Sequence, residues 1–562
     1  MSTVRPKAHP AARAASALAF FAAALALFSA CGRGERRATN VILFIGDGMS
    51  VESEIAASRY LYGRDRALAW HAMPGRSYVA TWDVTAYDAK ARNAGRAPNS
   101  EAVFAPSLGY DVRREGRRPF PDEGYVVAER PVPAPATDSA SAATALATGI
   151  KTDSGNIAWR SGDRPGGEIP TIAEEFRARR GGAIGVVTTV PFSHATPAAF
   201  VSHNTGRNHY YTGNRGYQGL GIADEIILRV KPDVVIGGGH PLLDNPAFDS
   251  RKGYISEALY TSLQSSPDYV LAERRPGADG SRTLLEAAAQ AIARGKKLFG
   301  LFGGAGGSFD LPLPEARPGA PAFTRETSED PAFKDAVLAA LRVLGRNPRG
   351  FFLMAEQGEI DWANHDNDFR RMIGAVADLD DAVKSVIAFV DEPGDDIDWT
   401  NTVLIVTADH STGGLRLDPK KPLGAGELPR QIARAKEEPA APPVNGNGRH
   451  PTVPRPALPA SKSPFIYPDG ELSYTAIGHT NELVTLAVTG AATPLFLQYK
   501  GWWYPGPIVD NTQINAGMRE ALGLGRRQVA PHAVAAPAIS APDKEIPPSG
   551  RRPESRVSSP RD

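Results

Sequence analysis

The sequence predicts an α/β fold in which one doubly wound, mostly parallel central sheet is flanked by helices on both faces and carries surface insertions. Three observations predict this class. Apolar runs rich in β-branched residues recur along the chain, and stretches with helical periodicity separate them. The composition, with 42% hydrophobic and 22% charged residues among 562, is typical of a soluble globular protein that buries a large core.

Six apolar runs have the length and composition of strands buried on both faces. They are residues 41–45, 183–190, 234–236, 298–302, 351–355 and 402–407. In a parallel sheet of this kind ligands bind at the carboxyl ends of the strands. The polar residues that follow each run are therefore the first candidates for chemistry.

Helices are expected between these runs. Thr171 and Glu174 have the spacing of a capping box, and Gly181 is expected to end the helix that they begin. Residues 281–294, 331–344 and 368–390 also carry apolar side chains at helical spacing. Strands and helices alternate, as the doubly wound fold requires.

The expected domain organisation is one catalytic domain over residues 38–525. Residues 83–135 and 417–468 are rich in Pro, Gly and Arg without persistent periodicity, and we interpret both as surface insertions. Residues 527–562 have almost no large apolar side chains and are predicted to form a disordered tail.

Residues 1–31 have the pattern of an export signal. Arg5, Lys7 and Arg13 precede an uncharged apolar run, residues 14–30, that ends at Cys31, the single cysteine of the chain. The segment resembles a bacterial lipoprotein signal, which would anchor Cys31 to the cell envelope through a lipid. Ordinary cleavage with release into the periplasm is the alternative, and a membrane span is a third reading, although the run is shorter than about 20 residues.

Charge excludes one class of partner. The chain has 63 Lys and Arg against 62 Asp and Glu, so it lacks the basic excess that holds a nucleic acid backbone. No nucleic acid binding is expected, and membrane contact is expected only through Cys31.

Carboxylates follow three of the predicted strands. Asp47 follows the first strand, Glu356 follows the fifth, and Asp409-His410 follows the sixth. Each acid alone could cap a turn or a helix. Together they indicate a metal site, because mixed Asp and His ligands suit zinc and oxygen ligands suit magnesium.

Two further features fit a metal-dependent hydrolase. Asp361 and His365 are four residues apart, so on a helix they share one face and can bind a single ion. Ser139 lies at the start of a run of small residues, 137–145, whose helical amino end would attract an anion. Simple helix capping is the structural alternative for this segment.

These residues resemble the alkaline phosphatase family over residues 41–488. The matching stretches are Ile45-Gly-Asp-Gly-Met49, Thr137-Asp-Ser-Ala-Ser141, His194-Ala-Thr-Pro-Ala198 with Arg207, Glu356-Gln-Gly-Glu-Ile-Asp361 with His365, Thr407-Ala-Asp-His410, and Gly478-His479-Thr480. Six stretches in family order make chance agreement an inadequate explanation.

The resemblance implies two zinc ions and one magnesium ion. One zinc ion would be bound by Asp361, His365 and His479. The second would be bound by Asp47, Asp409 and His410, with Ser139 reaching between the two ions. The magnesium ion would be bound by Asp47, Thr196 and Glu356.

Two positions depart from some family members. His194 stands where some members have an aspartate near the magnesium ion, so the third site could take Zn²⁺ or Co²⁺, with His194 as a further ligand. Trp362 stands where others have lysine or histidine. Arg207, thirteen residues after His194, corresponds to the family's phosphate-binding arginine.

The function that the resemblance implies is hydrolysis of small-molecule phosphate monoesters through a phosphoserine at Ser139, in an exported homodimer. A related two-metal hydrolase acting on phosphodiesters or sulfuryl esters is the alternative. Ser139-Ala140-Ser141 argues against a sulfatase, since it lacks the proline of the sulfatase motif. A surface lipoprotein that binds phosphate without turnover is a hypothesis from another class.

Overall fold

The computed structural model of the chain describes residues 37–93, 136–211, 219–241, 253–304, 306–394, 396–417, 423–430, 471–474, 476–504 and 506–527. The expected export signal with Cys31 lies outside these residues, as do most of both expected insertions. Of the expected tail only Arg527 is described, where its guanidinium contacts the Glu175 carboxylate. Among the described residues no helix combines the length and the hydropathy that a membrane crossing requires.

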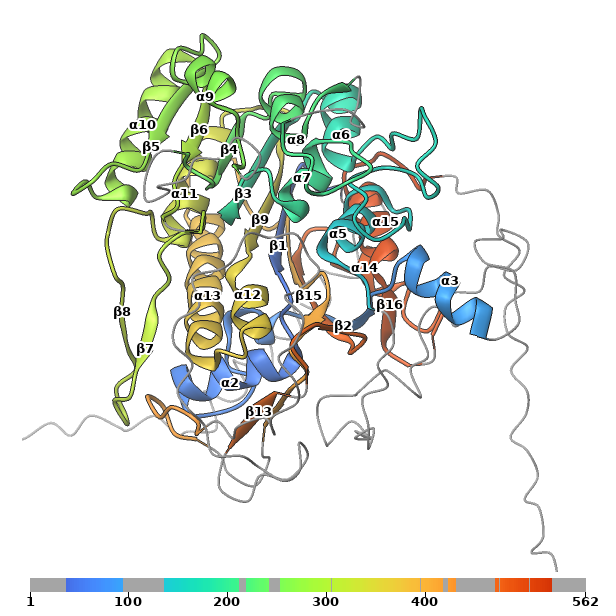
Figure 1. The fold of residues 1–562 in the computed structure, drawn as a ribbon, viewed down its shortest axis with the longest axis vertical. Coiled ribbons are helices and arrows are strands. Elements are labelled where there is room, and N and C mark those ends of the chain that lie inside the picture. The colour runs from blue at the N-terminus through green and yellow to red at the C-terminus, as the bar shows by residue number, and fades with distance from the viewer. Residues whose placement is uncertain are drawn as a thin grey trace, which may run out of the picture.

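A ten-stranded sheet forms the centre of the described part (Figure 1). In spatial order its strands are β16 (Ile508–Asp510), β2 (Gly75–Ala80), β15 (Val484–Gly490), β10 (Thr402–Thr407), β1 (Asn40–Gly46), β9 (Phe351–Gln357), β3 (Ala183–Pro191), β4 (Val234–Gly238), β6 (Lys297–Leu301) and β5 (Tyr269–Glu273). Within this sheet only β15 runs antiparallel to its neighbours. The predicted mostly parallel sheet is therefore confirmed.

Helices cover both faces of the sheet. Figure 1 shows α2, α10, α11 and α13 on one side and α5, α6, α7 and α15 on the other. Their bounds are α2 Val51–Tyr62, α5 Ser139–Thr148, α6 Ile172–Arg180, α7 Ala195–Val201, α10 Gly280–Arg294, α11 Phe333–Leu344, α13 Phe369–Asp391 and α15 Asn511–Ala521. This two-sided covering is the doubly wound arrangement that the sequence predicts.

Shorter elements join these layers. They are η1 Ala69–Ala72, α3 Val84–Asn93, α8 Ile222–Asp224, the π-helix η5 Glu225–Val230, α9 Glu257–Gln264, α12 Glu359–His365, α14 Thr493–Leu497, and the paired strands β7 Leu313–Glu315 with β8 Ala322–Thr324, β11 Ser411–Thr412 with β14 His479–Thr480, and β12 Leu415–Leu417 with β13 Leu472–Tyr474. The sequence did not predict α3, which begins the stretch that we interpreted as an insertion without periodicity.

Burial explains why the central strands form where the sequence predicts them. Every residue of β1, β9 and β10 is buried, because these strands have neighbours on both sides and helices on both faces. Full burial of each large aliphatic side chain stabilises the fold by roughly 1.5–3 kcal/mol. The predicted capping box is also present, since Thr171 and Glu174 cap α6 reciprocally and Gly181 ends it with φ 72°.

Candidate active site

Three carboxylates converge where the central strands end. β1 pairs with both β9 and β10, and Ile45 lies in register with Glu356 on one side and Thr407 on the other. Asp47 and Asp409 follow within two residues of these positions, and both are fully buried, as is Glu356. The carboxyl ends of three adjacent strands therefore place three acids in one buried cluster, which we call the acidic cluster.

Gly48 makes this convergence possible. Its φ of 65° lies in the left-handed region, and a Cβ at this position would come 2.6 Å from Asp361 Oδ1. The backbone N–H of Gly48 also donates to Asp409 Oδ1 at 3.0 Å. The turn after β1 therefore packs directly against the helix that carries Asp361.

Asp361 and His365 lie on α12 and face His479 of β14. The Nε2 atom of His365 lies 3.3 Å from Asp361 Oδ2 and 3.1 Å from the Nε2 atom of His479. Each ring uses Nδ1 to contact a backbone carbonyl, of Ile477 and Thr137 respectively. A carbonyl only accepts hydrogen bonds, so Nδ1 carries a proton in both rings and the two Nε2 atoms face each other.

His410 contacts both the acidic cluster and His479. Its Nε2 atom lies 3.4 Å from Asp47 Oδ1 and 3.3 Å from Asp409 Oδ2, and its ring stacks on that of His479 with centroids 3.7 Å apart. Two groups have the spacing of metal ligands: Asp47 with Asp409 and His410, and Asp361 with His410 and His479. The resemblance implies His365, where the second group has His410, as the partner of Asp361 and His479. The His365 side chain lies next to this group, with its Nε2 atom 3.1 Å from that of His479.

Ser139 begins α5 and faces the acidic cluster. Its Oγ lies 3.1 Å from His410 Nε2 and 3.4 Å from Asp47 Oδ1. Asp138 caps the helix by accepting the backbone N–H of Ser141 at 3.0 Å. Ser139 therefore directs its hydroxyl to the cluster.

Thr196 of α7 lies beside Glu356, and His194 is the residue directly before this helix. Glu356 accepts a hydrogen bond from Thr188 Oγ1 at 2.5 Å, and the Thr196 hydroxyl together with that of Thr188 partly offsets the rise in its pKa. His194 precedes α7 and is buried, with its ring 5.7 Å from that of Trp362 in an edge-to-face contact. The oxygen ligands that the sequence proposed for magnesium thus come from β1, β9 and α7.

Burial and mutual repulsion raise the pKa of several acids in the cluster. Burial, followed by the neighbouring Asp409 and Asp361, raises the pKa of Asp47 well above its usual value. Burial raises the pKa of Glu356 to about 7 and that of Asp409 to about 6. Burial also opposes ionisation of Asp361, but the adjacent His365 and then His479 hold its pKa well below the usual range.

Although burial opposes it, Asp361 raises the pKa of His365, whereas two other histidines respond in the opposite sense. Burial lowers the pKa of His410 to about 4 and that of His479 to about 3, so both are neutral at physiological pH. Neutral imidazoles cannot balance the acids around them, and they retain the lone pairs that a metal ion binds.

Arg207 lies beside the first turn of α5 and pairs with Asp138. Its guanidinium donates to Asp138 Oδ2 at 2.8 Å, and both side chains are about nine-tenths buried. Burial would raise the pKa of Asp138, but Arg207 and the Ser141 and Gly155 donors hold it well below its usual value. The Asp138 carboxylate therefore fixes Arg207 beside the first turn of α5.

The cluster has the properties of a cation site. Asp47 Oδ2, Asp409 Oδ2 and Glu356 Oε1 are buried, and no described residue donates a hydrogen bond to them. A buried carboxylate oxygen without a donor or a cation is costly. Together with the facing Nε2 atoms of His365 and His479, these oxygens are the hard and borderline ligands that magnesium and zinc use.

Several residues of the site escaped the sequence analysis. Thr412 donates to Asp361 Oδ1 at 2.5 Å, Thr188 donates to Glu356, and Asp138 holds Arg207. Thr188 could have been found, since it is a polar residue near the carboxyl end of a predicted strand. Thr412 gave no signal, because its role depends on where β11 meets α12.

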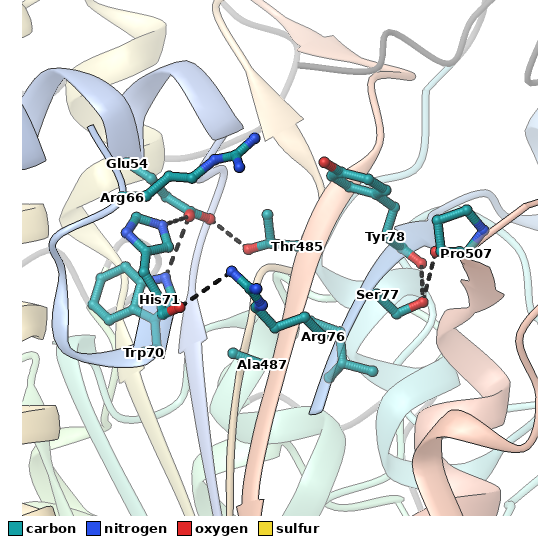
Figure 2. A pocket seen from close by; sticks show the side chains of 11 residues that line it. Glu54, Arg66, Trp70, His71, Arg76, Ser77, Tyr78, Thr485, Ala487 and Pro507 are labelled. Atoms are coloured by element: carbon teal, nitrogen blue, oxygen red, sulfur yellow. Dashed lines mark hydrogen bonds and ion pairs between the residues drawn. The ribbon is translucent and has the colours of Figure 1, made fainter. Parts of the chain in front are cut away.

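A separate cavity of about 370 Å³ lies between α2, β2 and β15. Figure 2 shows Trp70 and His71 on one side of it and Tyr78 on the other, with Arg76 between them. The Glu54 carboxylate and the His71 ring lie within hydrogen-bond distance, 2.7 Å apart, in its wall. No residue of the acidic cluster lines this cavity, so the chemistry is assigned to the cluster.

Comparison with known proteins identified relatives of the chain. Residues 121–450 match the family model described as alkaline phosphatase. Alkaline phosphatase 4 of Bacillus subtilis (strain 168) is 32% identical over 50% of this chain and 50% of its own length. Alkaline phosphatase of Escherichia coli (strain K12) is 30% identical over 67% of this chain and 71% of its own length. This chain spans about half the length of the Bacillus relatives that it matches.

A solved structure supports the fold. The cold-active alkaline phosphatase of the psychrophile Shewanella sp. superposes with a TM-score of 0.52 at 22% identity, covering 86% of this chain and 99% of that one. At this identity the likeness concerns the arrangement of the sheet and its helices. It agrees with the α/β class that the sequence predicts.

Proposed function

Because this chain belongs to the alkaline phosphatase family, we propose that it hydrolyses phosphate monoesters with Ser139 as the nucleophile. One observation carries the proposal. The Ser139 hydroxyl stands at the amino end of α5, 3.4 Å from Asp47 Oδ1, beside buried carboxylate oxygens to which no described residue donates. No contact among the described residues balances these carboxylate oxygens, whereas bound cations beside the serine would.

We propose that ten side chains hold the three cations. One zinc ion would be bound by Asp361, His365 and His479, and the other by Asp47, Asp409 and His410. Magnesium would be bound by Asp47, Thr196 and Glu356, with His194 as a further ligand that would also admit Zn²⁺ or Co²⁺. Ser139 would complete the zinc sites. When bound, the cations would lower the pKa of the serine hydroxyl and stabilise negative charge on the oxygens of the phosphate.

In the proposed reaction Ser139 is the nucleophile and Arg207 binds the phosphate group. Ser139 Oγ attacks phosphorus as its proton is lost, the bond from phosphorus to the ester oxygen breaks, and the alcohol leaves with a proton. Arg207 binds two of the remaining phosphate oxygens through its planar guanidinium. Water then attacks the phosphoserine from the opposite side, which releases inorganic phosphate and returns the Ser139 hydroxyl.

The cellular location is proposed from residues that lie outside the described part of the structure. We propose that residues 1–31 export the protein to the periplasm or anchor it to the cell envelope through a lipid on Cys31. Small-molecule monoesters are the proposed substrates, and a homodimer is the proposed assembly.

Turnover of p-nitrophenyl phosphate and of the corresponding diester tests the proposal. The purified protein should hydrolyse the monoester at least about a hundredfold faster than the diester, because Arg207 and the cations match three free phosphate oxygens. EDTA should abolish the activity and added Zn²⁺ with Mg²⁺ should restore it. Faster diester cleavage would favour the related diesterase function. Phosphate binding without any turnover would favour a binding protein.

A further inference from the structure

Asp83 is a buried carboxylate outside the acidic cluster, with about 1% of its surface exposed. It immediately precedes α3, and its Oδ1 accepts the backbone N–H of Ala86 at 2.7 Å. Its other oxygen, Oδ2, lies 3.1 Å from the Oγ atom of Ser141 on α5. One carboxylate therefore caps α3 and contacts the helix that begins with Ser139.

Ser141 is shared between two acids. Its Oγ lies 2.7 Å from Asp138 Oδ1 and 3.1 Å from Asp83 Oδ2, and the Thr137 hydroxyl lies 2.8 Å away. A serine hydroxyl carries one hydrogen, so Ser141 donates to Asp138 or to Asp83 but not to both. A neutral Asp83 would donate to Ser141 and leave the serine hydrogen to Asp138. An ionised Asp83 would compete for that hydrogen.

Asp138 is the carboxylate that holds Arg207. Its Oδ2 accepts from the guanidinium, while its Oδ1 accepts from Ser141 and from the backbone N–H groups of Ser141 and Gly155, both at 3.0 Å. When a donor leaves Oδ1, more of the negative charge of Asp138 is available to Arg207. Hydrogen bonding to Ser141 therefore affects how firmly Arg207 is held.

We propose that Asp83 is a positioning residue for Arg207 and that it acts through Ser141 and Asp138. The proposal rests on the phosphate-binding role proposed for Arg207. Asp83 itself touches neither the acidic cluster nor the phosphate in this scheme. An ionised Asp83 takes the Ser141 hydrogen, Asp138 then binds Arg207 more tightly, and less of the guanidinium is available to phosphate.

The surroundings of Asp83 bring its ionisation into the neutral range. Burial raises the pKa of Asp83 to about 7, and the nearby Asp138 raises it further, while the Ala86 N–H, Ser141 and Lys151 oppose the rise. The Lys151 ammonium is 3.2 Å from Asp510 Oδ1, so its charge is largely balanced by that carboxylate. The position of the Ser141 hydrogen is therefore expected to change between about pH 6 and about pH 9.

Asp83→Asn tests the inference. Asparagine can still cap α3, and it stays neutral and able to donate to Ser141 at every pH. Inhibition by inorganic phosphate should be equal in the two proteins at about pH 6. At about pH 9 the variant should bind phosphate about fivefold more tightly, the effect of one hydrogen bond. Titration of phosphate and of the acidic cluster is common to both proteins and cancels in this ratio.

Ser141→Ala is the matched control, because it removes the link between the two acids. In that background Asp83→Asn should leave the phosphate inhibition constant unchanged at both pH values. A ratio of one at every pH, or the same change with and without Ser141, would overturn the inference. If Asp83→Asn fails to fold, Ser141→Ala alone should abolish the step in phosphate affinity that Asp83 causes, and persistence of that step would equally overturn it.

Arg207→Ala separates this inference from the proposed function. If this variant leaves phosphate inhibition unchanged, the proposed role of Arg207 is wrong. If it weakens inhibition while Asp83→Asn changes nothing, the proposed function stands and only the role of Asp83 is wrong.

Discussion

Two clusters of carboxylates lie at the same edge of the central sheet and are neutralised in different ways. The acidic cluster follows β1, β9 and β10. The second cluster surrounds Arg274, which follows β5, and contains Asp310, Glu329 and Asp330. Both collect acids where parallel strands end, as the fold dictates.

The cluster around Arg274 is satisfied by the protein itself. The guanidinium contacts Asp330 at 3.2 Å and Glu329 at 3.1 Å. Backbone N–H groups of Gly303 and Asp310 donate to Asp330 at 2.8 and 2.9 Å. In the acidic cluster, by contrast, three carboxylate oxygens have no donor among the described residues, and His410 and His479 are neutral. Acids that the chain leaves unsatisfied thus indicate a bound cation, and acids that it satisfies indicate structure.

Among changes at the acidic cluster, replacement of the nucleophile should have the largest effect on turnover. Ser139→Ala should lower turnover of p-nitrophenyl phosphate by at least about ten-thousandfold, because covalent catalysis is lost while the cations remain. Zinc content measured by elemental analysis should stay unchanged. Ser265→Ala, at an exposed position, is the control. Turnover within about tenfold of the parent would refute the role of Ser139.

Breaking the second cluster should affect stability instead. Arg274→Met leaves three acids without their shared cation, so the free energy of unfolding should fall by about 3–5 kcal/mol. Urea denaturation measures this change, and turnover per folded molecule should not change. Arg282→Ala, which removes an exposed ion pair with Glu286, should have little effect on either quantity. A loss of turnover without loss of stability would contradict the division between the clusters.

A matched pair of aspartates compares the clusters directly. Asp409→Asn should lower zinc content and reduce turnover by about a hundredfold, because a charged ligand is lost. Asp330→Asn should leave zinc content and turnover intact, since Asp330 bonds only to Arg274 and backbone N–H groups among the described residues. Elemental analysis and monoester kinetics check both variants. Equal loss of zinc in the two would show that the comparison is wrong.

The smallest expected effect is a difference in how the stability of the protein depends on pH. In metal-free protein burial raises the pKa of Glu356 to about 7 and that of Asp409 to about 6. A carboxyl whose pKa rises on folding stabilises the fold below its unfolded value of about 4, and this contribution is lost as the pH rises through the folded value. The urea midpoint of metal-free protein should therefore fall between about pH 4 and about pH 7.

Zinc should remove that part of the pH dependence, because bound cations favour the ionised carboxylates. Burial raises the pKa of Asp330 to about 6 as well, but no cation site is involved there. Asp330→Asn should thus reduce the dependence of the urea midpoint on pH equally with and without zinc. Identical profiles for metal-free and zinc-loaded protein would contradict the assignment of the acidic cluster.

The sequence predicted the fold where burial alone decides the structure. β1, β9 and β10 are continuous apolar runs, so their bounds follow from composition. β2 and β15 were missed because Arg76 and Thr485 interrupt the pattern near the end of the sheet, where side chains reach the surface. α3 was missed because the amphipathic pattern of Val84–Asn93 is weak, and the Asp83 cap that fixes its start is visible only in the fold.

The candidate site was predicted in part for the same reason. Asp47, Glu356 and Asp409 follow buried strands, so the topology alone brings them together. His479 lies over a hundred residues from Asp361, and the resemblance to the family, rather than any local pattern, associated the two. The contact between Asp83 and Ser141 joins residues 58 positions apart on two helices, and nothing in the sequence marks it.

Trapping the covalent intermediate tests the central claim most directly. Metal-loaded enzyme would be mixed with a phosphate monoester, quenched in acid and digested, and the peptides analysed by mass spectrometry. The account predicts one added phosphoryl group on Ser139, absent from Ser139→Ala and from EDTA-treated protein. Turnover of the monoester with no phosphoryl group on the chain, or with the group on another residue, would contradict it.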